Sequence, residues 1–166
     1  MEKTLNSNDL ARFIEDEGIT AVIIRLDTPT KTVTDAAAAL GVQPEQIIKS
    51  VLFLADGAPV LVITNGLTRI RYKALADFLG LSRRRLKMAD AAQVLAITGY
   101  VVGSVPPFGH LQPIRTVVDT AVTQLPHTHI YGGGGDINAL LQITPAELLR
   151  IFQKQNEPTT IDGLSN

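Results

Sequence analysis

The sequence predicts an α+β fold, in which a mixed, largely antiparallel central β-sheet is surrounded by helices. Two nearly continuous apolar runs, 47–54 and 59–64, flank Asp56-Gly57, a pattern typical of a β-hairpin whose strands are covered on both faces. Apolar residues at helical spacing recur between the strand-like runs and stop at glycines. The 166 residues are 45% hydrophobic but only 5% aromatic, which favours one domain over 1–166 with an aliphatic core.

The helices are predicted from their capping residues and their stops. Asn6 and its neighbours can cap a first helix that ends at Gly18, because short polar side chains satisfy free amides and glycine adopts left-handed backbone. Thr144-Pro145 opens the last helix with a cap and a preset φ angle. The predicted helices are those between Asn6 and Gly18, 35–40, a turn from Pro44, 72–79, 89–97, and one from Pro145 onward.

The strands are predicted from β-branched and apolar runs bounded by turn residues. We expect them at 19–26, 47–54, 59–64, 114–118, 127–131 and 140–143. No repeat and no interdomain linker interrupts this order. The tail after about residue 155 is expected to fray, as the last residues of a domain commonly do.

Lys49 is the first candidate site residue, because it lies inside an apolar strand. Burying an unpaired ammonium is costly, so such a lysine is normally paired or aimed into a cleft or at a ligand. The simpler alternative is a lysine whose amine reaches water at the strand end. Asp27, Asp119 and Asp136 are the nearest candidate partners, although turn capping is the commoner role of Asp.

The loop 99–113 is the second candidate, because it carries three Gly and three Pro. Loops of this length in a compact domain are more often functional than not. Proline fixes φ and glycine permits close contact, which suits a preshaped pocket wall. No Gly-x-Ser-x-Gly elbow is present, so a serine triad is not indicated. A purely structural loop is the alternative. The candidate wall residues are Gly103, Ser104, Pro106, Pro107, Phe108 and Gly109.

The third candidate is the run Gly132, Gly133, Gly134 and Gly135, followed by Asp136. Its backbone amides could cradle an anion or a carbonyl. No Gly-Lys-Ser/Thr follows, so it is not a P-loop. A tight turn is the alternative, but four glycines exceed what a turn requires, which favours close approach of the backbone to a ligand.

A basic segment, 69–87, holds seven of the chain's 15 Lys and Arg against the single acid Asp77, although the net charge of the chain is -1. It is either a solvated surface or a surface that binds phosphates. The residues taken as candidate phosphate contacts are Arg69, Arg71, Lys73, Arg83, Arg84 and Arg85.

Other chemistries are less well supported. The absence of cysteine excludes disulfides and thiolate sites and is consistent with the cytoplasm. No apolar run is long enough for a membrane span and no signal peptide is apparent, so we expect a cytoplasmic protein with no membrane partner. His110, His127 and His129 could hold a metal, but nothing in their spacing supplies a second shell. We expect no metal and no cofactor.

Three segments resemble the YbaK family, which includes the freestanding YbaK and ProX deacylases and the editing insertion domain of bacterial prolyl-tRNA synthetases. Residues 32–50 are similar to the family's stretch that ends in its key lysine. Residues 98–109, Thr-Gly-Tyr-Val-Val-Gly-Ser-Val-Pro-Pro-Phe-Gly, are similar to its most specific loop, and a glycine run follows Ile130 as it does there. The resemblance covers about residues 8–153.

The resemblance implies hydrolysis of the ester between a wrong amino acid and the 3′ adenosine of a tRNA. Lys49 would orient the substrate, the two glycine-rich loops would line its pocket, and the basic segment would contact tRNA phosphates. Ser104 and Pro106 depart from the family loop, and Leu26-Asp27-Thr28 replaces its Tyr-x-His, so a pocket that includes Leu26 and Thr28 need not share a relative's amino-acid preference. A synthetase is a possible partner, and a non-catalytic tRNA- or synthetase-binding module is the alternative.

Overall fold

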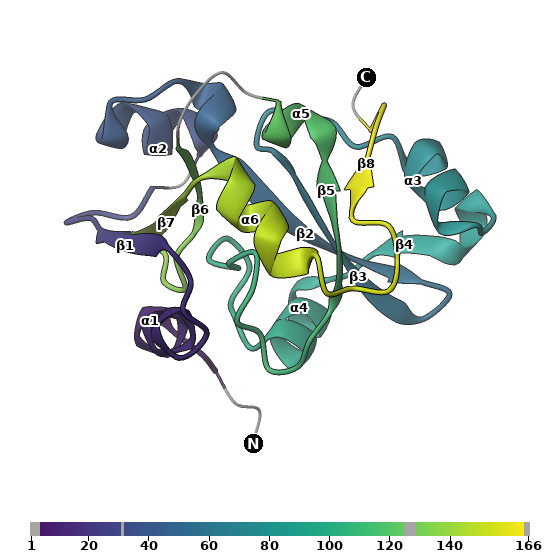
Figure 1. Ribbon diagram of the computed structural model, residues 1–166, viewed down its shortest axis with the longest axis horizontal. Coiled ribbons are helices and arrows are strands. Elements are labelled where there is room, and N and C mark those ends of the chain that lie inside the picture. The colour runs from purple at the N-terminus through teal and green to yellow at the C-terminus, as the bar shows by residue number, and fades with distance from the viewer. Residues whose placement is uncertain (1–3, 31, 125–128, 165–166) are drawn as a thin grey trace.

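A computed structural model describes residues 4–30, 32–124 and 129–164. Figure 1 shows helices packed around two groups of strands. The helices are α1 (Ser7–Asp16), α2 (Val33–Leu40), α3 (Tyr72–Leu79), α4 (Ala91–Thr98), α5 (Thr120–Thr123) and α6 (Pro145–Phe152), with 3₁₀ turns η1 (Pro44–Gln46) and η2 (Arg83–Arg85). The strands are β1 (Ala21–Arg25), β2 (Ile48–Ala55), β3 (Ala58–Asn65), β4 (Leu86–Met88), β5 (Arg115–Asp119), β6 (Ile130–Gly133), β7 (Ala139–Ile143) and β8 (Thr160–Ile161).

The strands form two sheets whose pairing is mostly antiparallel. This confirms the predicted α+β fold class. The larger sheet has the order β4-β2-β3-β5-β8, and the smaller has the order β1-β7-β6. The pairs β2–β3, β2–β4, β1–β7 and β6–β7 are antiparallel, while β3–β5 and β5–β8 are parallel. A single parallel bridge between Ile47 and Tyr131 links the sheets. Where the sequence predicted one central sheet, the structure has two, and this bridge connects them.

The predicted β-hairpin is confirmed: β2 and β3 pair antiparallel around Asp56-Gly57. Asp56 and Gly57 have φ angles of 51° and 86°, the two positive values that a type I′ turn requires. Ala55 faces Ala58 next to the turn, and the pairing continues without a slip to Ile48 and Asn65.

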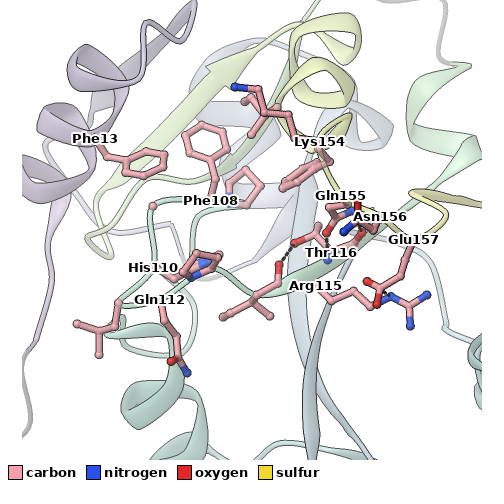
Figure 2. A pocket seen from close by; sticks show the side chains of 17 residues that line it. Phe13, Phe108, His110, Gln112, Arg115, Thr116, Lys154, Gln155, Asn156 and Glu157 are labelled. Atoms are coloured by element: carbon pink, nitrogen blue, oxygen red, sulfur yellow. Dashed lines mark hydrogen bonds and ion pairs between the residues drawn. The ribbon is translucent and has the colours of Figure 1, made fainter.

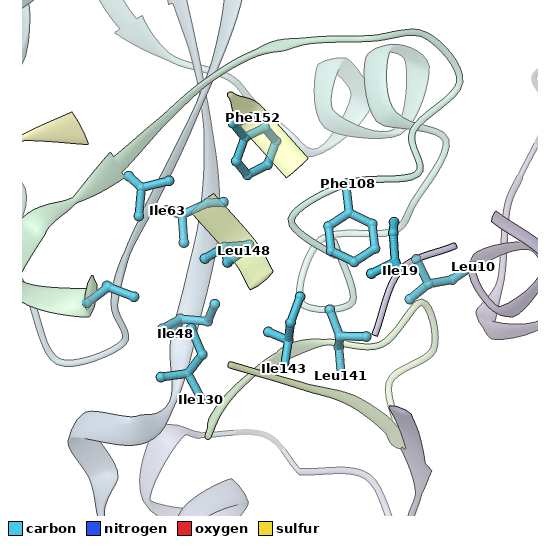
Figure 3. Packing of buried hydrophobic residues seen from close by; sticks show 12 residues of the cluster. Leu10, Ile19, Ile48, Ile63, Phe108, Ile130, Leu141, Ile143, Leu148 and Phe152 are labelled. Atoms are coloured by element: carbon cyan, nitrogen blue, oxygen red, sulfur yellow. The ribbon is translucent and has the colours of Figure 1, made fainter. Parts of the chain in front are cut away.

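One hydrophobic cluster joins the two sheets (Figure 3). Ile48 and Ile63 from the large sheet meet Leu141 and Ile143 from the small one, and Leu148 of α6 packs against them. All five side chains are at most 3% exposed, so the relative position of the two sheets is set by close packing.

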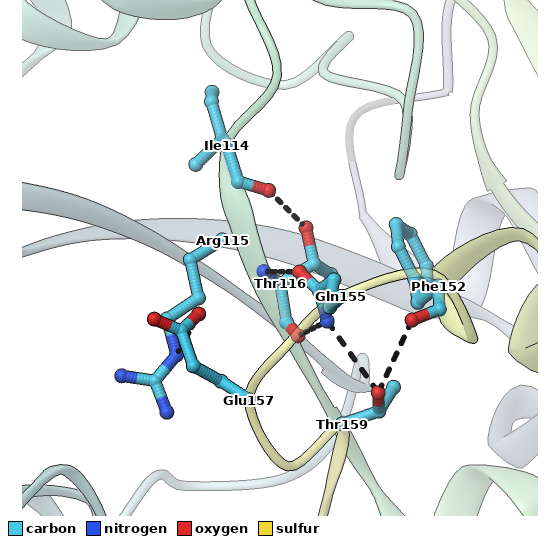
Figure 4. Close-up of polar contacts among 7 residues, drawn as sticks. All are labelled: Ile114, Arg115, Thr116, Phe152, Gln155, Glu157 and Thr159. Carbon is cyan, nitrogen blue, oxygen red and sulfur yellow. Dashed lines mark hydrogen bonds and ion pairs between the residues drawn. The ribbon is translucent and has the colours of Figure 1, made fainter.

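Residues 156–164, part of the tail for which the sequence predicts fraying, lie against the larger sheet. β8 pairs in parallel with Val118 and Asp119. Ile161 and Leu164 are buried, and the Leu164 carbonyl accepts a hydrogen bond of 2.8 Å from the Arg71 amide. Gln155 anchors the start of this segment through the amide and carbonyl of Thr116 (Figure 4). Two buried aliphatic side chains, those of Ile161 and Leu164, thus hold this segment against the rest of the domain.

Candidate functional site

A cavity of about 280 Å³ lies beside the edge of β2. β4 pairs with β2 only at Phe53–Ala55, and among the described residues the only backbone bridge from β2's edge to the small sheet is that between Ile47 and Tyr131. The stretch of this edge between the two pairings borders the cavity. The cavity brings together members of all three candidate segments: Lys49, Gly103 and Gly133. Its full lining is Ile48, Lys49, Ser50, Val51, Leu52, Met88, Ala89, Val94, Val102, Gly103, Val105 and Gly133.

Lys49 is the one cation in this lining. Its side chain is partly buried, and this burial lowers the pKa of the ammonium below its usual range. The Nζ atom donates a hydrogen bond of 3.2 Å to the Thr68 carbonyl. Within the described part of the chain Lys49 forms no ion pair, so its charge remains available to a ligand.

Asp119 and Asp136, two of the three candidate acids, form hydrogen bonds away from Lys49. The buried Asp119 caps α5 by accepting from the Ala121 amide and also accepts from the Thr64 hydroxyl. Asp136 accepts from the amide of Ser7, the first residue of α1. Neither acid lines the Lys49 cavity. The cavity therefore offers a cation without a carboxylate base beside it.

The loop 99–113 carries no helix or strand, as predicted, and is held by its own hydrogen bonds. The Ser104 hydroxyl donates to the Val101 carbonyl at 2.7 Å, so it is bonded within the loop rather than directed at a ligand. The Tyr100 hydroxyl donates to the Gly109 carbonyl at 3.1 Å. Gly103, which belongs to the cavity lining, has a φ of 92° and no atom within 4 Å of the place its Cβ would take.

The glycine run is explained mainly by the protein's own backbone. A Cβ on Gly133 would overlap the Val105 carbonyl, and one on Gly134 would lie 2.5 Å from the Ala139 carbonyl carbon. Gly135 has a φ of 95° and lies against Ser7. The amides of Gly134 and Gly135 donate to the Ala139 and Ser104 carbonyls. The close approach that we attributed to a ligand is thus an approach to other main chain, and only Gly133 of the four lines the cavity.

Several predicted pocket residues lie elsewhere. Phe108 is buried against Phe13, with ring centroids 5.9 Å apart. Pro107, Phe108 and Gly109 border a second cavity of about 520 Å³, between α1 and the end of α6 (Figure 2). Pro106 is buried outside both linings. Leu26 packs near α2, and Thr28 is exposed.

Sequence reasoning missed most of the apolar lining. Met88 ends the three-residue strand β4, which was not predicted because it follows directly on an arginine-rich 3₁₀ turn. Val94 belongs to α4, whose sequence is apolar on all sides and gives no sign of which face borders the site. Ser50 could have been found, since it adjoins Lys49 in the same strand.

The basic segment is partly engaged in local contacts. Lys73 pairs with Asp77, Arg85 pairs with Asp56, and Arg71 donates to the Gly163 carbonyl. The Arg83 guanidinium lies 4.3 Å from the centroid of the Tyr72 ring. Among the described residues no hydrogen bond or ion pair engages Arg69 or Arg84, so these two are the freest candidates for phosphate contacts.

The candidate histidines do not form a described metal site. His127 lies outside the described residues. Burial lowers the pKa of His110 to about 4, and its Nε2 atom lies 2.8 Å from the Pro106 carbonyl. No group of three potential ligands is close enough for a metal within the described ranges. Nor does any helix in them have the length and apolarity to cross a membrane.

Comparison with known proteins places this architecture in a family. A structure described as a proposed trans-editing enzyme for prolyl-tRNA synthetase superposes with a TM-score of 0.85 at 27% identity, covering 96% of each chain. The proline–tRNA ligase of Latilactobacillus sakei subsp. sakei (strain 23K) is 36% identical over 137 residues, which are 80% of this chain and 24% of the ligase. That of Streptococcus equi subsp. zooepidemicus (strain H70) is 30% identical over 147 residues, or 85% and 23%.

The chain thus spans less than a quarter of the length of these ligases. The aminoacyl-tRNA editing domain matches residues 27–151, a range that contains Lys49 and both glycine-rich segments. The YbaK resemblance predicted from the sequence is confirmed, and this protein belongs to the aminoacyl-tRNA editing domain family.

Proposed function

We propose that this protein is a trans-editing hydrolase that removes a mischarged amino acid from the 3′ end of a tRNA. The observation that carries the proposal is the convergence of Lys49, Gly103 and Gly133 on one cavity in a chain of the editing family. The cavity is otherwise lined by aliphatic side chains and Ser50, so an aminoacyl group could enter with little polar surface to displace.

The reaction needs positioning more than a protein nucleophile. Water adds to the aminoacyl carbonyl carbon, the bond to the ribose oxygen breaks, and that oxygen receives a proton, which yields the free amino acid and the tRNA. The ester is already activated, so holding it and stabilising the negative charge that develops on the carbonyl oxygen supply most of the acceleration. Lys49 supplies the positive charge, and the open backbone at Gly103 supplies close contact.

Lys49 acts in this scheme by orienting the substrate. Its ammonium remains a donor to the Thr68 carbonyl, and no described carboxylate pairs with it to accept a proton. A fixed cation can bind either the terminal ribose-phosphate or the carbonyl oxygen of the ester. The substrate's own groups would then assist the attacking water.

The partners follow from the same proposal. Aminoacyl-tRNA is the substrate, and the likeness to parts of proline–tRNA ligases makes a synthetase the natural second partner. Phosphates of the tRNA would contact the basic segment 69–87, with Arg69 and Arg84 the least engaged locally. Such contacts add affinity without sequence information. We place this activity in the cytoplasm, where translation occurs.

Incubation with a panel of mischarged tRNAs tests the proposal. We expect wild-type protein to release at least one amino acid, and Lys49→Ala to remain folded by circular dichroism while losing release. The contrary result is that tRNA binds but neither wild type nor Lys49→Ala releases an amino acid, at protein concentrations at which a known deacylase is active. The chain would then be a binding module and not a hydrolase.

A further inference from the structure

Two exposed apolar side chains stand at the Lys49 cavity. Met88 comes from β4 and Val102 from the loop 99–113, and each is 52% exposed. Both belong to the cavity lining, so their exposed surface continues directly from its wall. Single exposed apolar residues are common, but two from different elements at one functional cavity form a contact surface for a ligand that fills it.

The size of the cavity determines which part of the substrate reaches this surface. Its volume of about 280 Å³ is just below the range of about 300–1,000 Å³ that encloses a drug-sized ligand. An aminoacyl-adenosine is a ligand of that size. With the aminoacyl ester and its ribose beside Lys49, little of this volume is left for the adenine base, which would then lie at the rim.

We propose, on the basis of the proposed function, that Met88 and Val102 hold the terminal adenine base of the aminoacyl-tRNA. A base can pack between apolar side chains, and a methionine sulfur interacts favourably with aromatic rings. Such packing reads no hydrogen-bond pattern, and none is needed because the base at the end of a tRNA is always adenine. Lys49 and the rim would thus bind the two ends of the same terminal nucleoside.

Binding can be measured without any hydrolysis. The chain contains two methionines, Met1 and Met88, so methyl-labelled methionine gives a signal for Met88 that a Met88→Leu variant assigns. Adenosine should shift the Met88 methyl signal through the ring current of the base, and ribose should not. An equal shift with ribose, or no shift at saturating adenosine, would overturn the proposal.

Steady-state kinetics of variants at Met88 and Val102 give a second test of the proposal. Met88→Ala and Val102→Ala should each raise KM for aminoacyl-tRNA about three- to tenfold with kcat little changed, while Met88→Leu should stay close to wild type. Val22→Ala is the matched control, because Val22 is 55% exposed on β1 and lies outside this lining. An aminoacyl methyl ester, which has no base, should show no effect of either rim variant.

The two proposals fail separately. If wild-type protein releases no amino acid from any tRNA, the proposed function falls, and the adenosine titration still decides whether the rim binds a base. If release occurs but the rim variants raise KM equally for aminoacyl-tRNA and for the methyl ester, only the rim proposal falls.

Discussion

The Lys49 ammonium and the Thr68 carbonyl are joined by a hydrogen bond of 3.2 Å, which holds the one cation of the cavity in place. Burial lowers the pKa of Lys49, so the folded protein disfavours its protonated form. That penalty is present at neutral pH and fades only as the pH rises through the lowered pKa toward the ordinary value.

Lys49→Met should therefore separate activity from stability. Methionine keeps the length of the side chain and removes the charge that burial penalises. We expect deacylation to be lost while the free energy of unfolding at pH 7, measured in urea, is equal to or above that of wild type. Lys154→Met, at the second cavity, is the control and should keep activity. A destabilised Lys49→Met protein would mean that the ammonium serves the fold.

His110 should make the fold sensitive to acid. Burial lowers its pKa to about 4, whereas histidine in the unfolded chain titrates near its ordinary value of 6.5. A lowered histidine pKa contributes stability that is complete above about pH 6.5 and is lost as the pH falls toward 4. This difference corresponds to at most about 3 kcal/mol.

The matched variant is His110→Gln, whose amide nitrogen can take the place of Nε2 opposite the Pro106 carbonyl. Urea unfolding between pH 4 and 7.5 should show a shallower loss of stability at acid pH in the variant than in wild type. Parallel pH profiles would show that His110 titrates normally and is accessible to water.

The sequence predicted the long elements because their signals are local. The β2–β3 hairpin follows from Asp56-Gly57 between apolar runs, and α6 from the cap and proline at Thr144-Pro145. The short strands β4 and β8 were missed, because two- and three-residue strands are fixed by their partners in the sheet and not by their own composition.

Only part of the candidate site could be predicted, because only local signals can be read from one sequence. Lys49 was found because a charge in an apolar strand is visible in one sequence. The packing of Gly133 against Val105 was not found, because it joins segments about 30 residues apart that only the folded chain brings together. From sequence alone, a glycine required by a neighbouring backbone looks the same as one required by a ligand.

Gly133→Ala tests this packing. The added methyl would overlap the Val105 carbonyl, so the loop must move, and we expect a loss of about 1–3 kcal/mol in the free energy of unfolding. Because Val105 lines the cavity, deacylation should fall as well. Gly132→Ala is the comparison, since its Cβ would meet side-chain atoms of Ile48 at 3.1 Å and Pro107 at 3.9 Å and no backbone carbonyl, so we expect a smaller loss of stability. Equal stability of the two variants would contradict the tight Gly133–Val105 packing.

The basic segment yields the last prediction, because its charges differ in how they are used. Arg84 has no described partner, whereas Arg85 pairs with Asp56. If Arg84 contacts a tRNA phosphate, Arg84→Gln should weaken binding of every tRNA by a similar factor and reduce the slope of log Kd against log salt by about 0.7–0.9. Lys154→Gln removes the same charge at the second cavity and should leave the slope unchanged. Filter binding at several salt concentrations measures both. A slope reduced equally by the two variants would indicate that tRNA responds to the overall charge of the protein and not to a defined surface on this segment.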